Sequence, residues 1–160
     1  MAVIGIITQN DNTIEIEEKI KKYDNHEKNL IIINEDNAEN IKHVKFDVIV
    51  IFEEIEVTNN IKEVTARSKY IIVNSDFKNN LRLLDSNNVP YVITYGFSSK
   101  ATITIISNEN DEIILDIQRE IENISKKKIE SQEIKLESKF GKKHIYEEIA
   151  MKILEIMVKI

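Results

Sequence analysis

The chain has 160 residues, a net charge of −6 and no cysteine. This length fits one ordinary domain with its own core, and the lack of cysteine excludes disulfides, thiolate metal sites and a cysteine nucleophile. Acidic and basic residues are interspersed, which disfavours nucleic acid as a partner. No apolar run reaches membrane-spanning length, and the first residues do not resemble a signal peptide. We therefore expect a cytoplasmic protein with no membrane partner.

Apolar runs alternate with amphipathic segments from the start of the chain to Gly96. Strands are expected at five apolar runs: Ala2–Thr8, Leu30–Asn34, Phe46–Phe52, Lys69–Val73 and Tyr91–Thr94. Helices are expected between them: Thr13–Tyr23, Asp36–Val44, Ile61–Arg67 (capped by Asn59 or Asn60) and Phe77–Asp85. This alternation predicts an α/β fold with a mostly parallel sheet and helices on both faces.

The pattern changes after Gly96. Ala101–Ser107 and Glu112–Gln118 flank an Asn-Glu-Asn-Asp turn, which predicts an antiparallel hairpin. Ser131–Ser138 alternates and is expected to add a third strand to this small subsheet, after a charged connection at Arg119–Glu130. The chain is therefore predicted to be one domain over residues 1–160, with a parallel part (1–96), an antiparallel part (97–140) and a C-terminal helix (141–160).

The C-terminal helix is expected at Lys143–Ile160, where apolar side chains cover more than half of the helical circumference. A helix that lies on one sheet needs an apolar arc of about 100°. The excess predicts packing on two sides. Met151, Leu154 and Val158 are therefore candidate interface residues, and the chain is expected to form a homo-oligomer.

The first strand leads through a polar loop, Gln9–Asn12, into a helix that begins at Thr13. A strand, a tight loop and a helix N-terminus form a natural anion site, because free N–H groups and the helix dipole point outward. A working phosphate loop also needs glycines and a lysine, and this loop has neither. A structural turn with an Asn or Asp cap explains the segment as well.

Three segments resemble the central domain of the Mur ligases. Ile4–Thr13 (IGIITQNDNT) is similar to that family's first strand and loop, IGITGTNGKT, with Asn12 in place of the phosphate-binding lysine. Tyr70–Asp76 (YIIVNSD) and Val92–Phe97 (VITYGF) resemble its patterns vvNaDD and ViTYGf, in the same order and at similar spacing. The start of the last helix keeps the spacing of the family's G-x-H-N-v-y-N-a-l-A-A pattern from Gly141 onward, without its polar residues.

The resemblance implies a phosphate-loop-like sheet and a candidate nucleotide site. Its residues would be Asn10, Asn12, Thr13, Asn74 and Asp76. ATP and Mg²⁺ are the cofactors to consider, with Glu53 and Glu54 as candidate metal ligands at a strand end. A solvated acidic loop is the alternative for those two glutamates, and turn or cap roles are the alternative for Asn74 and Asp76. The family's substrate-binding and amino-acid-binding domains have no counterpart in these residues.

Three functions follow as hypotheses. The first is a non-catalytic Mur-ligase-like domain that acts by binding or assembly. The second is a weak nucleotide-binding protein or residual ligase-type enzyme. The third, from the resemblance alone, is a regulatory subunit that binds a cell-wall biosynthesis protein. His26, His43 and His144 are far apart in sequence and are expected to be surface residues rather than metal ligands.

Overall fold

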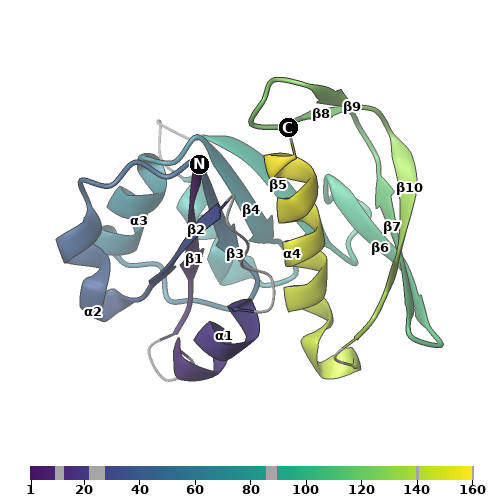
Figure 1. Cartoon of the computed structure of the whole chain (residues 1–160), viewed down its shortest axis with the longest axis horizontal. Helices are drawn as coiled ribbons and strands as arrows, with labels where there is room; N and C mark the ends of the chain where they lie inside the picture. Colours follow the sequence, from purple (N-terminus) through teal and green to yellow (C-terminus); the bar gives the residue numbers. More distant parts are fainter. Residues whose placement is uncertain (10–12, 22–27, 86–89, 140, 160) are drawn as a thin grey trace.

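An eight-stranded sheet runs through the molecule (Figure 1), in the order β10-β7-β6-β5-β4-β3-β1-β2. The computed structural model describes residues 1–9, 13–21, 28–85, 90–139 and 141–159. The strands of this sheet are β1 (Ala2–Ile7), β2 (Lys28–Ile33), β3 (Val48–Ile51), β4 (Tyr70–Asn74), β5 (Tyr91–Gly96), β6 (Ile103–Glu109), β7 (Glu112–Ile117) and β10 (Gln132–Glu137). The helices are α1 (Thr13–Ile20), α2 (Glu35–Ala38), α3 (Asn59–Ala66) and α4 (Ile145–Val158), with 3₁₀ segments η2 (Glu39–Ile41), η3 (Lys78–Leu84) and η4 (Lys142–His144).

The expected α/β class with a mostly parallel sheet is confirmed. Strands β2, β1, β3, β4, β5 and β6 are parallel to one another, and β7 is antiparallel to both of its neighbours, β6 and β10. In the first half of the chain β1 lies between β2 and β3. The chain therefore passes from β1 to β2 on one side and then crosses to β3 on the other side of β1. This reversal is the switch point of a doubly wound sheet.

Helices cover both faces of the parallel part, as the continuous apolar strands predict. Alternate residues of one strand enter different cores: Val48 and Val50 of β3 join the core under α1 and α4, while Ile49 and Ile51 join the core under α2 and α3. All four side chains are fully buried. The two-sided burial explains why these strands contain isoleucine and valine without polar alternation.

Two helical expectations need correction, and a third is described only in part. The helix before β4 is capped by Thr58, whose Oγ1 accepts from the N–H of Ile61, rather than by Asn59 or Asn60, which lie within its first turn. The segment Phe77–Asp85 forms a 3₁₀ helix instead of an α-helix. The first helix begins at Thr13 as expected, whereas its expected end at Tyr23 lies outside the described residues.

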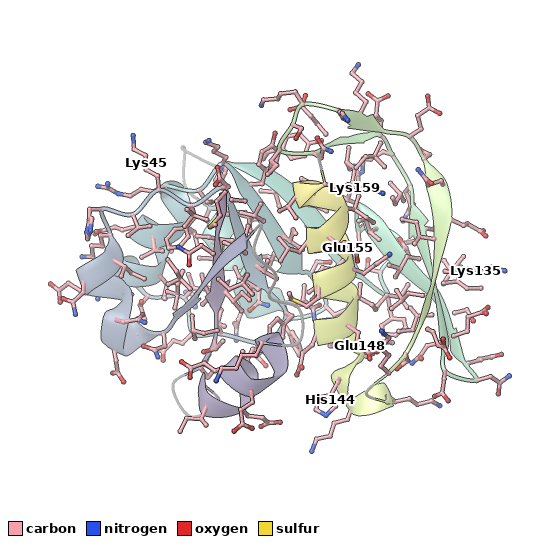
Figure 2. All side chains as sticks on the ribbon, viewed as in Figure 1. Lys45, Lys135, His144, Glu148, Glu155 and Lys159 are labelled. Carbon is pink, nitrogen blue, oxygen red and sulfur yellow. The ribbon has the colours of Figure 1, made fainter. Side chains whose placement is uncertain are left out.

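The hairpin is present, but it does not form a separate subsheet. Residues Tyr95 and Gly96 of β5 pair in parallel with Ile103 and Thr104, so β6, β7 and β10 extend the main sheet. The expected third strand is β10, and its outward side chains are charged; Figure 2 shows Lys135 pointing away from this edge. Charged side chains on an edge strand hinder pairing with another chain.

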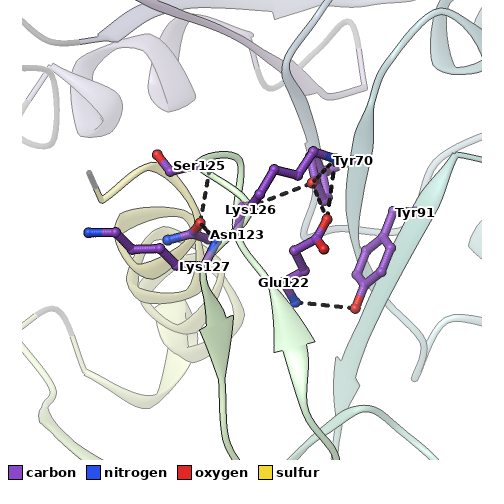
Figure 3. A network of polar contacts seen from close by, with 7 residues as sticks. All are labelled: Tyr70, Tyr91, Glu122, Asn123, Ser125, Lys126 and Lys127. Atoms are coloured by element: carbon purple, nitrogen blue, oxygen red, sulfur yellow. Dashed lines mark hydrogen bonds and ion pairs between the residues drawn. The ribbon is translucent and has the colours of Figure 1, made fainter.

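The connection before β10 also forms structure that the sequence did not predict. Strands β8 (Ile121–Glu122) and β9 (Lys128–Ile129) make a two-stranded antiparallel ribbon. Figure 3 shows the ribbon at the amino ends of β4 and β5, where the Tyr70 hydroxyl donates to Glu122 Oε1 over 3.1 Å and Lys126 Nζ lies 3.2 Å from the same oxygen. The ribbon thereby closes the edge of the sheet that lies opposite the strand carboxyl ends.

Helix α4 lies against the concave side of the curved sheet, between the parallel strands and the β6-β7-β10 part (Figure 1). Its wide apolar arc does pack on two sides, and both sides belong to this chain. Met151 is 4% exposed and Leu154 is fully buried, while Val158 is half-buried against the same core. Met151 and Leu154 are therefore not available to a partner, and the apolar arc gives no argument for a homo-oligomer.

Candidate functional site

The carboxyl ends of the parallel strands meet along one edge, where ligands bind in doubly wound sheets. Five short segments lie there: Thr8–Gln9 after β1, Glu53–Glu56 after β3, Asn74–Asp76 at the end of β4, Gly96–Phe97 at the end of β5, and the first turn of α4. The edge therefore brings together Glu53, Glu54, Asn74 and Asp76, which the sequence analysis selected. Asn10 and Asn12 lie outside the described residues, and of Thr13 the structure describes only that it begins α1.

Asn74 ties the ends of β3 and β4 together. It is fully buried, its Nδ2 donates to the carbonyl of Phe52 over 2.9 Å, and its Oδ1 accepts from the N–H of Asp76. Asn80 of η3, also fully buried, donates to the carbonyls of Asn74 and Glu53 and accepts from the N–H of Ile55. Buried amides with such partners satisfy backbone groups that the sheet leaves open, so the role of Asn74 is structural.

Asp76 accepts hydrogen bonds at the end of β5. Its carboxylate accepts from the N–H of Phe97 at 3.0 and 3.1 Å and from the hydroxyl of Tyr146 at 2.7 Å. The rings of Phe77 and Phe97 lie edge-on to the ring of Tyr146, with centroids 5.6 and 6.2 Å away. Asp76 is thus held by strand β5 and helix α4 together.

Two tyrosines beside Asp76 keep their protons to high pH. Burial, and then the hydrogen bond to Asp76, raise the pKa of Tyr146 to about 12. Burial raises the pKa of Tyr95 well above its usual range, with further effects from Tyr146 and Asp76, and its hydroxyl donates to the carbonyl of Tyr146. Both phenols are therefore neutral hydrogen-bond donors at physiological pH.

The two candidate metal ligands are bonded to the protein itself. Glu53 Oε1 accepts from the backbone N–H of Gln9 over 2.8 Å, and Glu54 Oε1 accepts from Asn79 Nδ2 over 2.7 Å. In the part of the chain that the structure describes, no three His, Asp or Glu side chains are grouped as metal ligands. The arrangement therefore does not fit the Mg²⁺ site that the resemblance implies.

A cavity of about 320 Å³ opens beside the end of β1, on the side of α2 and α3. It is lined by Ile7, Thr8, Gln9, Glu35, Ile55, Glu56, Thr58 and Ile61. The sequence did not predict this cavity, because its residues come from three segments that lie at least 20 positions apart and share no motif. The one available signal was an acidic residue after the second strand (Glu35) and another after the third (Glu56).

The described histidines do not form a site. His43 is exposed, and His144 Nδ1 lies 3.4 Å from Glu147 Oε1 at the start of α4; His26 lies outside the described residues.

Among the described residues, no helix is long and apolar enough to cross a membrane. No family model matches this sequence, and no curated protein is significantly similar to it.

Proposed function

We propose that the chain is a non-catalytic domain that acts by binding or assembly, on a framework that resembles the central domain of the Mur ligases. One observation supports the proposal: a carboxylate accepts the hydrogen bond of the first backbone N–H in the loop that resembles a phosphate loop. The N–H of Gln9 opens the loop between β1 and α1, and it donates to Glu53 Oε1 over 2.8 Å.

The chemistry of that contact opposes nucleotide binding. A phosphate loop holds its ligand through free backbone N–H groups, a lysine and the helix dipole. Here the first loop N–H is already bonded to an anion, and Asn12 stands where the lysine would be. Two unit charges of the same sign 4 Å apart repel by about 1 kcal/mol in water and by about 4 kcal/mol near a protein surface, so a triphosphate beside Glu53 is strongly disfavoured.

The remaining motif residues support the same conclusion. Asn74 and Asp76 use their side chains to join β3, β4, β5 and α4. These segments resemble those of a nucleotide site, but their polar groups bond to the protein itself. A fold can be kept in this way without the chemistry that it supports in other proteins. The framework then serves as a rigid support for binding at another place on its surface.

Isothermal titration calorimetry with ATP and Mg²⁺ tests the proposal. We expect no binding heat at millimolar nucleotide and no rise in Tm, because a ligand that binds the native state would raise Tm. The Glu53→Gln variant keeps an acceptor for the Gln9 N–H without the charge and serves as the comparison. A dissociation constant below about 1 mM for the wild type, or release of phosphate from ATP, would contradict the proposal.

The homo-oligomer and the cell-wall partner remain predictions of the sequence. Static light scattering of the purified chain over a range of concentrations addresses the first. A constant mass of one chain would remove self-assembly and leave binding of another molecule.

A further inference from the structure

A second cavity lies between the β8–β9 ribbon, strand β10 and the end of α4. Its volume is about 360 Å³, which is at the small end of the range for small-molecule sites. Figure 1 shows the ribbon beside the C-terminal end of α4, where the N–H of Ile124 donates to the carbonyl of Met157 over 3.0 Å. The cavity is therefore far from the strand carboxyl ends and separate from the segments that resemble a nucleotide site.

Three isoleucines give this cavity an apolar floor that a ligand can reach. Ile129 of β9, Ile134 of β10 and Ile156 of α4 line it, and each is partly exposed rather than sealed in the core. Apolar surface that stays in contact with water in the folded chain can be covered by an apolar ligand with a gain in free energy. The floor therefore favours a ligand with a hydrocarbon part.

The charged side chains that line the cavity are all basic. They belong to Lys127, Lys128 and Lys159, in a chain whose net charge is −6. Lys128 has an acidic partner outside the lining, since its Nζ lies 3.4 Å from Glu120 Oε1 in an exposed ion pair. Among the described residues, neither Lys127 nor Lys159 forms an ion pair. Two lysines without an acidic partner therefore border one apolar floor.

Asn123 fixes the backbone of both of these lysines. The residue is 4% exposed, and its Oδ1 accepts from the N–H groups of Ser125 and Lys127 at 2.9 and 3.0 Å (Figure 3). Its Nδ2 donates over 3.1 Å to the carbonyl of Lys159, which Figure 2 labels at the end of α4. This last bond also occupies a carbonyl whose partial negative charge, at the end of a helix, would otherwise repel an anion.

The combination selects a singly charged anion with an apolar chain. Ammonium groups attract a carboxylate and repel a cation, and lysine stems can lie along apolar surface while their charged ends stay in water. A divalent metal needs carboxylate or carbonyl ligands, and the described lining has no carboxylate. The isoleucines are less exposed than the lysines around them, which suits a single chain that enters the cavity rather than a membrane surface.

We propose that this cavity binds a carboxylate on a short hydrocarbon chain. The carboxylate accepts from the ammonium groups of Lys127 and Lys159, and the chain lies against Ile129, Ile134 and Ile156. The inference rests on the proposed binding function and names the ligand class.

The experiment titrates the full chain, labelled with ¹⁵N, with sodium hexanoate and follows the amide shifts. We expect saturable shifts at Lys127, Ile129, Ile134 and Ile156, with a millimolar dissociation constant, because a ligand of eight heavy atoms in an open cavity makes few contacts. The probes 1-hexanol, hexylammonium, acetate and inorganic phosphate are titrated at the same ionic strength, since salt screens exposed charges. Equal or stronger binding of any of these four, or no saturable shift with hexanoate, would overturn the proposal.

A membrane surface is the other source of anionic groups on hydrocarbon chains. Sedimentation with phosphatidylglycerol vesicles, against phosphatidylcholine vesicles, separates it from a soluble ligand. We expect the chain to stay in the supernatant with both. Sedimentation with phosphatidylglycerol alone, lost in Lys127→Gln, would overturn the proposal in favour of a membrane contact.

Four variants separate a binding role from a structural one. Lys127→Gln and Lys159→Gln should each weaken hexanoate binding about three- to fivefold and leave 1-hexanol binding unchanged, because the alcohol has no charge. Ile156→Gln should weaken the binding of both, because it removes part of the floor. Lys45→Gln changes an exposed lysine outside the cavity and is the matched control. A lower Tm with unaltered hexanoate affinity in both cavity-lysine variants would assign these lysines to the helix end and overturn the proposal.

The outcomes also distinguish this inference from the proposed function. If neither hexanoate nor ATP binds, the ligand class is wrong and the non-catalytic assignment stands. If ATP binds at submillimolar concentration, the proposed function fails whatever the hexanoate titration shows.

Discussion

At the end of β5, Gly96 leaves room for the carboxylate of Asp76. A Cβ atom at this position would lie 2.4 Å from Asp76 Oδ1 and 2.7 Å from its Cγ. Gly96→Ala must therefore displace a carboxylate that accepts from Phe97 and Tyr146. We expect the free energy of unfolding to fall by about 2–4 kcal/mol, measured by urea denaturation. In the Asp76→Ala background the same change should cost less, and an equal cost in both backgrounds would contradict this explanation.

Tyr146 gives the molecule an alkaline limit. Its pKa is raised to about 12 by burial and by the bond to Asp76, compared with about 10 in an unfolded chain. The folded state therefore holds this proton more tightly, so the contribution to stability is complete below pH 10 and is lost as the pH rises from about 10 to about 12. Urea midpoints should fall across this range, and less steeply in Tyr146→Phe. Identical slopes for the two proteins would exclude Tyr146 as the cause.

At the scale of elements, the β6–β7 turn carries Asp111 at a position where glycine is more favourable. Asn110 and Asp111 both have positive φ, 54° and 61°, which suits a two-residue type I′ turn, in which Asn-Gly is the preferred pair. Asp111→Gly should therefore raise the free energy of unfolding by about 0.5–1 kcal/mol, whereas Asp111→Ala should lower it by about 1 kcal/mol. Chemical denaturation of both variants measures the two signs, and destabilisation by glycine would show that the Asp111 side chain has another role.

The same elements show how far the sequence predicts the fold. Strands β1, β3, β4 and β5 were predictable because Ile, Val and Tyr recur without polar interruption, as burial on both faces requires. The 3₁₀ form of Lys78–Leu84 was not, because Asn80 is drawn toward the strand ends by three hydrogen bonds that depend on tertiary position. The β8–β9 ribbon was missed for a similar reason, since Tyr70 and Tyr91 that anchor it lie far away in sequence.

The candidate site divides in the same way. The pattern of strands alone predicts that Asn74 and Asp76 lie at the strand carboxyl ends. Their partners do not, because Asn74 bonds to Phe52 and Asp76 to Tyr146, 22 and 70 residues away. The cavity at Thr8 depends on the packing of α2 and α3 beside β1, and no local periodicity records it.

At the scale of the whole molecule, α4 joins the two halves of the sheet. Its buried residues share one core with Ile4, Val50 and Ile72 of the parallel part and with Ile105 and Leu115 of the antiparallel part. The apolar arc that the sequence analysis assigned to a partner is thus the surface on which both halves meet. Beside α4, the described parts of α1 and of the ribbon add Ile16 and Ile121 to this core, so removal of α4 would take away the element that contacts both halves.

This arrangement predicts that the chain unfolds as one cooperative unit. Leu154 and Ile153 of α4 are fully buried, so Leu154→Ala should cost about 2–5 kcal/mol through lost burial and the cavity left behind. Because α4 touches both halves, hydrogen exchange should accelerate to a similar degree in β4 and in β7. Calorimetry should give one transition whose van't Hoff and calorimetric enthalpies agree, in wild type and variant. Exchange that accelerates in one half alone, or two separate heat-absorption peaks, would mean that β6, β7 and β10 fold independently of the parallel strands.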